Sequence, residues 1–206
     1  FYGITMVNSQ AVQIGGTTPA ARNVISGNDP SGINLQFGSP DTVIHGNYIG
    51  TNSAGDQAVG NAVFGVKVIL TNDGGNKVGG DQPGEGNLIS GNGDAGVYVS
   101  LSTNSAVQGN IIGLNATGAG AVPNLGAGIR MTISSNVLIG GDVAGARNII
   151  SGNGETGVQI SRNDMDNPNG ARLYGNYIGA DITGESAIPN AGPGVELLDT
   201  SNNIIG

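Results

Sequence analysis

The fold is decided by the string Asn23-Val24-Ile25-Ser26-Gly27-Asn28, which returns as Asn87-Leu88-Ile89-Ser90-Gly91-Asn92 and as Asn148-Ile149-Ile150-Ser151-Gly152-Asn153. A second string, Gly46-Asn47-Tyr48-Ile49-Gly50, returns at 109–113 and at 175–179. Strings that recur in the same order and phase indicate tandem structural repeats, each of which is one supersecondary unit.

Each long unit splits into two similar halves that open with Gly and an apolar-x-apolar triplet. The seven openings are at Gly3, Gly32, Gly65, Gly96, Gly128, Gly157 and Gly194. They divide the chain into six complete coils of 29 to 37 residues and a partial seventh. We therefore expect one domain over 1–206, built from two-coil units at 3–64, 65–127 and 128–193 and a partial coil at 194–206.

Each coil is predicted to contain three short strands separated by Gly/Asn turns. The alternation in the opening triplet is that of a strand with one buried face. A second strand centres on an apolar residue (Ile14, Ile44, Val78, Val107, Ile139, Leu173, Ile205), and a third begins at an Asn (Asn23, Asn47, Asn87, Asn110, Asn148, Asn176). The sequence thus predicts an all-β, right-handed parallel β-helix of about six and a half coils, which buries one continuous core by stacking.

Two columns of polar residues are predicted to support this stack. One is the Asn that begins each third strand, and the other closes that strand. The second column is expected to contain Asn28, Asn52, Asn92, Asn115, Asn153 and Asp181. Stacked amides can hydrogen-bond along a parallel stack, so we interpret both columns as scaffold. Calcium is the alternative, but the Gly-Gly-x-Gly-x-Asp pattern of calcium-binding repeats is missing, and we predict no metal and no cofactor.

The composition excludes several classes of protein. The chain has 39 Gly, 8 Pro, no Cys and a net charge of −8. The absence of Cys excludes disulfides and thiolate sites, and the acidic balance argues against a nucleic-acid partner. No apolar run is long enough for a membrane span. Because the chain opens at Phe1 inside the pattern, we expect it to be a piece of a longer protein.

The motifs together resemble the right-handed parallel β-helix repeats of large bacterial surface and secreted proteins. These motifs are Asn-(Val/Ile)-Ile-Ser-Gly-Asn, Gly-Val-x-Ile, Gly-Asn-x-Ile-Gly and the Thr-Gly-x-x-Ala-(Val/Ile)-Pro-Asn loop, and they cover almost all of the chain. The architecture is similar to that of pectate lyases, polygalacturonases, alginate epimerases and phage tailspikes. The resemblance implies an extracellular or cell-surface location, and no catalytic motif of those enzymes matches residue by residue.

Catalytic groups are sparse in the pattern. The middle residues of the triplets should face outward, and they contain no carboxylate pair of the kind that acid–base catalysis on a glycan uses. The strongest catalytic candidates are Arg162, Asp164, Asp166 and Arg172, because they lie where coil six breaks the repeat. The alternative is a solvated loop with local ion pairs. His45, whose column also contains Gln and Tyr, is expected to be an ordinary exposed polar residue.

A ligand-binding surface is predicted around Lys67, Tyr98 and Arg130, which should stack on one outward face. Two cations beside an aromatic ring could bind an acidic or neutral glycan. The alternative is an ordinary solvated strand with a cation–π contact.

The leading functional interpretation is a non-catalytic solenoid that serves as a rigid spacer or as an adhesive surface that binds polysaccharide. One alternative is a carbohydrate-active enzyme domain, a polysaccharide lyase or glycoside hydrolase, with its site on one face. The other is a fibre subunit that self-associates end to end, because solenoids need polar caps and neither end shows one.

Overall fold

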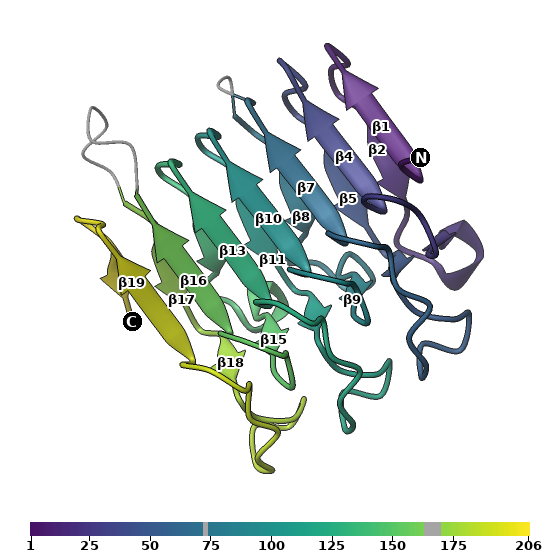
Figure 1. Cartoon of the computed structure of the whole chain (residues 1–206), viewed down its shortest axis with the longest axis vertical. Coiled ribbons are helices and arrows are strands. Elements are labelled where there is room, and N and C mark those ends of the chain that lie inside the picture. Colours follow the sequence, from purple (N-terminus) through teal and green to yellow (C-terminus); the bar gives the residue numbers. More distant parts are fainter. Residues whose placement is uncertain (72–73, 163–169) are drawn as a thin grey trace.

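The computed structural model describes residues 1–71, 74–162 and 170–206 and shows a parallel β-helix of about six coils. Three parallel sheets run along the whole solenoid, and each coil contributes one strand to each sheet (Figure 1). The described residues contain no helix with the length and apolar character that a membrane crossing requires.

Sheet A is built from the opening triplets. Its strands, in spatial order, are β1 (Ile4–Val7), β4 (Ile33–Gln36), β7 (Val66–Ile69), β10 (Val97–Ser100), β13 (Ile129–Thr132), β16 (Val158–Ser161) and β19 (Val195–Leu198).

Sheet B follows in each coil, and sheet C completes it. Sheet B contains β2 (Gln13–Gly15), β5 (Val43–His45), β8 (Lys77–Gly79), β11 (Ala106–Gln108), β14 (Leu138–Gly140), β17 (Arg172–Tyr174) and β20 (Ile204–Ile205). Sheet C contains β3 (Val24–Ile25), β6 (Tyr48–Ile49), β9 (Leu88–Ile89), β12 (Ile111–Ile112), β15 (Ile149–Ile150) and β18 (Tyr177–Ile178).

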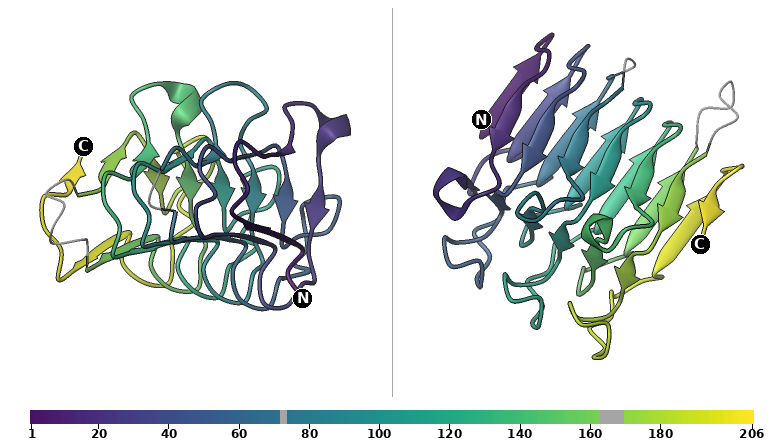
Figure 2. Two further views of the ribbon diagram at one scale, coloured as in Figure 1. Left: turned by 90° about the horizontal axis from the view of Figure 1, so that it is seen from above. Right: turned by 180° about the vertical axis from the view of Figure 1, so that it is seen from behind.

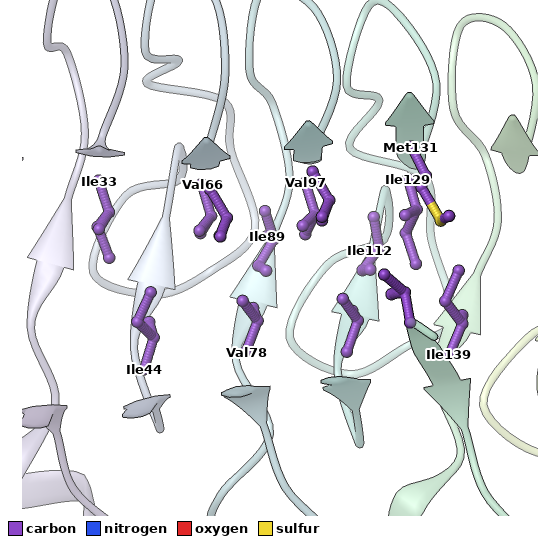
Figure 3. Packing of buried hydrophobic residues seen from close by; sticks show 14 of the residues in the cluster. Ile33, Ile44, Val66, Val78, Ile89, Val97, Ile112, Ile129, Met131 and Ile139 are labelled. Atoms are coloured by element: carbon purple, nitrogen blue, oxygen red, sulfur yellow. The ribbon is translucent and has the colours of Figure 1, made fainter. Parts of the chain in front are cut away.

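The core is a set of aliphatic rows, because like residues of successive coils are paired in register. On sheet A, Val97 is paired with Val66 and with Ile129. On sheet B, Ile139 is paired with Val107 and with Leu173. Figure 3 shows the rows from the three sheets meeting inside the solenoid. Most of these side chains are fully buried, so the inner columns predicted from the sequence are confirmed.

The first predicted Asn column forms a ladder at the corner between sheets B and C. The side-chain oxygen of each Asn accepts bonds from the Asn one coil earlier, in the series Asn23, Asn47, Asn87, Asn110, Asn148 and Asn176. The amide group of Asn110 also donates to the carbonyl oxygen of Val78, in the preceding coil, at 2.8 Å. Buried amides thereby satisfy one another along the stack.

The prediction of the second Asn column is wrong in the second, fourth and sixth coils, which are the even coils. The ladder runs through Asn28, Asn61, Asn92, Asn124, Asn153 and Asn190. In the even coils a loop is inserted directly after the third strand, so the residue that reaches the corner is the Asn at the end of the loop. Asn52, Asn115 and Asp181 begin these loops instead.

Those three residues close the even-coil loops from within. Asn52 Oδ1 accepts the backbone N–H of Asp56, and Asn115 Oδ1 accepts that of Ala119. In the third loop, the Thr183 hydroxyl donates to Asp181, and this bond is the largest cause that lowers the pKa of the Asp181 carboxyl from its ordinary value. Successive loops also touch, since Ala116 N–H donates to Gly55 O at 2.8 Å.

In coils one, three and five a loop is inserted between the sheet B strand and the sheet C strand. These odd-coil loops project from the corner between sheets B and C. Two of them contain short 3₁₀ helices, η1 (Pro19–Ala21) and η2 (Ala144–Ala146), which stand on the same side of the solenoid (Figure 2). These loops stack closely, because a Cβ on Gly145 would lie 1.9 Å from the carbonyl oxygen of Asp81.

The corner between sheets A and B is strained. The residue directly after every sheet A strand has a positive φ of 47° to 57°, in the series Asn8, Phe37, Leu70, Leu101, Ile133, Arg162 and Asp199. Asn and Asp tolerate this left-handed conformation, whereas a β-branched residue such as Ile133 is an outlier there. Side-chain hydroxyls brace the same corner, since Thr71 and Ser102 are hydrogen-bonded across coils.

We expect Asn110→Ala to destabilise the fold by about 3 kcal/mol or more. The substitution removes the acceptor of the buried Asn87 backbone N–H, one of the two acceptors of the Asn87 side-chain amide and the amide that donates to Val78 O. Each orphaned buried group costs about 1–3 kcal/mol. Urea unfolding measures the change. Asn23→Ala, at the exposed end of the same ladder, is the control and should cost much less. Equal losses would contradict the ladder's role.

We expect Ile133→Asn to stabilise the protein by about 1 kcal/mol, because the left-handed conformation costs an ordinary residue about 1–2 kcal/mol and Ile133 is 40% exposed. Ile133→Ala retains the Cβ and should give little change. A loss of stability in Ile133→Asn, measured by thermal unfolding, would show that the corner is not strained.

Candidate functional site

The outward residues of sheet A form one row along the coils. The row contains Thr5, Asn34, Lys67, Tyr98, Arg130, Gln159 and Glu196, each paired in register with the next. Tyr98 lies directly between Lys67 and Arg130, as the sequence predicts.

Arg130 is held by two carboxylates. Its Nη1 lies 2.8 Å from Asp94 Oδ2, and its Nη2 lies 3.0 Å from Glu155 Oε2. Its Nε donates to Gln159 Oε1 at 3.1 Å. The carboxylates of Asp94 and Glu155 neutralise the guanidinium. Arg130 is therefore a fixed, partly neutralised group with few N–H groups left for a ligand.

Tyr98 stacks on Phe64, which enters from the end of an even-coil loop. The ring centroids lie 4.6 Å apart and the planes differ by 8°. Both side chains are half-buried. Two stacked rings form a rigid aromatic platform on the outer face of sheet A.

The proposed catalytic cluster is divided between two sheets. Asp164 and Asp166 lie outside the described residues. Arg162 follows β16 of sheet A and occupies the regular positive-φ position of that corner, so it stays in phase with the repeat. Arg172 lies in β17 of sheet B, where its Nη2 donates to the side-chain oxygen of Asn136.

Tyr98, Arg130 and Arg162 meet at one shallow hollow of about 370 Å³ on sheet A. Thr132, Ser161, Leu198 and Asp199 complete its lining. The hollow joins part of the predicted binding surface with one of the predicted catalytic candidates. Lys67 lies outside the lining, one strand away from Tyr98 in the same row. Within the described part of the chain, Lys67 and Arg162 form no salt bridge.

A second hollow lies on the outer face of sheet B and contains His45. The sequence predicts an exposed polar residue at this position, and that prediction is wrong, because His45 is 8% exposed. The odd-coil loop 80–86 of the next coil lines the same hollow through Asp81 and Glu85. The loop that lines this hollow comes from the next coil. The residues at positions equivalent to His45 therefore give no sign of its burial.

The odd-coil loops also fix two arginines that the sequence analysis did not single out. Arg22 lies over the ring of Tyr48, and Arg147 over that of Tyr177, each with its guanidinium carbon 4.0 Å from the ring centroid. Both pairs tie a loop to sheet C by a cation–π contact. The recurrence of Arg at equivalent loop positions and of Tyr at equivalent sheet C positions is the sequence feature that could have predicted these contacts.

No group of three or more His, Asp or Glu side chains within the described ranges could hold a metal ion.

We expect the Arg130–Asp94 pair to be coupled by about 0.5–1 kcal/mol, since both side chains are partly exposed. A double-mutant cycle of Arg130→Met and Asp94→Asn, measured by urea unfolding, tests this, and the coupling should shrink at high salt. Arg147→Met combined with Asp94→Asn is the control pair and should be additive. A coupling of zero would contradict a stabilising role for the ion pair.

No family model matches the sequence, and no curated protein matches it either. Solved structures do share its fold. The A-module of the mannuronan C-5 epimerase AlgE4 from Azotobacter vinelandii is 17% identical, with a TM-score of 0.54 over 98% of this chain and 56% of that one. The periplasmic alginate epimerase AlgG is 20% identical, with a TM-score of 0.55 over 100% of this chain and 47% of that one.

The chain therefore spans about half the length of these structures. They are carbohydrate-modifying enzymes, and at this identity the likeness establishes a shared parallel β-helix architecture, as the sequence predicts.

Proposed function

We propose that the chain is a carbohydrate-active solenoid domain that binds a polysaccharide along the outer face of sheet A. The observation that carries this proposal is the hollow where the Phe64–Tyr98 platform adjoins Arg130 and Arg162. The hollow lies within a row that is partly exposed from Lys67 to Glu196, and a row of that kind suits an extended polymer.

The side chains of this surface have the chemistry that sugars require. The aromatic platform offers an apolar face for a sugar ring, and Thr132 and Ser161 offer hydroxyls that donate and accept hydrogen bonds. Lys67 and Arg162 would supply positive charge for a carboxylate, next to the single carboxylate of the lining, Asp199. Uronate polymers are the first substrates to test, because AlgE4 and AlgG are named as epimerases of mannuronan and alginate.

The second candidate function is catalytic turnover of the bound polysaccharide. We favour it over the non-catalytic spacer or adhesive that the sequence suggested. The support is the likeness of the fold to two epimerases. A periplasmic or extracellular location accompanies this proposal. If the domain is catalytic, new anomeric NMR signals should appear when it is incubated with mannuronan.

We expect Lys67→Ala combined with Tyr98→Ala to weaken binding of alginate oligomers by at least tenfold, which corresponds to about 1.4 kcal/mol. Arg162→Ala should lower the affinity further and reduce its salt dependence, because a charge contact is lost. Isothermal titration calorimetry measures both effects.

The matched controls are Lys77→Ala and Tyr174→Ala, which remove the same residue types from sheet B. These variants should bind alginate as the parent chain does. Unchanged binding in the sheet A variants, or equal losses in both sets, would remove the site from sheet A.

A further inference from the structure

His45 has a buried imidazole with no hydrogen-bond partner. It ends β5 on the outer face of sheet B and is 8% exposed. Neither Nδ1 nor Nε2 has a partner in the described residues. A buried polar group without a partner costs about 1–3 kcal/mol, and almost all such groups in folded proteins are paired. The described residues thus leave the imidazole without a hydrogen-bond partner.

The space beside the ring is a hollow of about 300 Å³. Besides His45 its polar lining consists of Gln13, Lys77, Asp81, Glu85 and Gln108, from three strands and one loop of successive coils. The floor includes Gly79 and Gly80. The volume is at the lower end of the range for small-molecule sites, which suits a ligand of one or two rings.

Two glycines line this hollow where neighbouring groups pack closely against the backbone. Gly79 has a φ of +83°, and a Cβ there would lie 1.9 Å from the carbonyl oxygen of Gln108. A Cβ on Gly80 would lie 2.0 Å from Glu85 Oε2. Both positions therefore require glycine, because the next coil and the Glu85 carboxylate occupy the space that a side chain would need.

Several lining groups are already oriented by the fold. Gln108 donates through its Nε2 to Gly140 O at 2.9 Å, and Gln13 donates through its Nε2 to Gly15 O at 3.1 Å. Glu85 Oε2 accepts the backbone N–H of Gln82 at 3.0 Å. The amide oxygens of the two glutamines remain as acceptors, and Lys77 supplies donors.

This set of groups selects for a neutral ligand rich in hydroxyls. Each ring nitrogen of an imidazole can form a hydrogen bond with a hydroxyl, because a hydroxyl both donates and accepts. The hollow carries one cation, Lys77, against two carboxylates, Asp81 and Glu85, so a carboxylate or sulfate ligand would meet net negative charge.

We propose that this hollow is a binding subsite for a neutral sugar residue, with a sugar hydroxyl hydrogen-bonded to the His45 imidazole. The subsite lies on sheet B, whereas the proposed polysaccharide surface lies on sheet A, so the two proposals stand on different residues. Each can fail without the other.

The test uses His45 as its own reporter, because the chain contains a single histidine. Imidazole ¹H–¹⁵N spectra are recorded while methyl glycosides of glucose, galactose and mannose are added, with glucuronate as the charged comparison. We expect saturable shifts of the imidazole nitrogens with at least one neutral glycoside and none with glucuronate. No saturable shift with any of the three, or stronger binding of glucuronate, would overturn the proposal.

The binding variants are His45→Gln and His45→Ala. Gln is the residue that this chain places at the equivalent position of β11, as Gln108, so His45→Gln should fold normally. His45→Ala should weaken binding of the responding glycoside at least tenfold by calorimetry, and His45→Gln should retain part of the affinity. Gln57→Ala, in the exposed loop of the same coil as His45 and outside both hollows, should leave this binding unchanged. Full affinity in His45→Ala would also overturn the proposal.

Discussion

The structure depends on the pairing of each buried corner amide with its counterpart one coil away. Strands in a parallel stack pair through their backbones, but the turns between sheets leave N–H and C=O groups that no strand can satisfy. Asn side chains meet that need at two corners, since one amide both donates and accepts along the stack. Asn47 illustrates this, because it accepts from Asn23 and donates to Asn87 and to the carbonyl of Ile14. Each coil is thus bonded to its neighbours at its corners as well as along its strands.

The same constraint distinguishes the residues that support the fold from the residues that could bind a ligand. Inner columns and corner ladders repeat with little change, because a substitution there affects three coils at once. The outward positions are free to vary, and the unusual groups are found there: the aromatic platform of Phe64 and Tyr98, the held guanidinium of Arg130, and the unpaired imidazole of His45. The loops decide what becomes of these groups. Phe64 arrives from an even-coil loop, and an odd-coil loop lines the hollow over His45.

The sequence predicts the three strands of each coil and their register, because period-two alternation and fixed Gly positions repeat in every coil. It places the first Asn ladder correctly for the same reason. It fails at Asn52, Asn115 and Asp181, since distance along the chain made them equivalent to Asn28, whereas closure of the inserted loop brings Asn61, Asn124 and Asn190 to the corner. The Asn that ends each loop motif is the sequence feature that could have identified the correct ladder residues. The ion pairs of Arg130 and the burial of His45 depend on residues one coil away, and a reading of one column at a time does not find them.

Distances between spin labels test the central claim most directly, and the absence of native cysteine allows labels to be placed freely. Thr5 on β1 is labelled together with Lys67, Arg130 or Glu196, which lie two, four and six strands further along sheet A. Direct stacking at about 4.8 Å per strand predicts backbone separations of about 10, 19 and 29 Å that rise in equal steps. Separations that fail to rise linearly, or that place Glu196 near Thr5, would contradict the stacked solenoid.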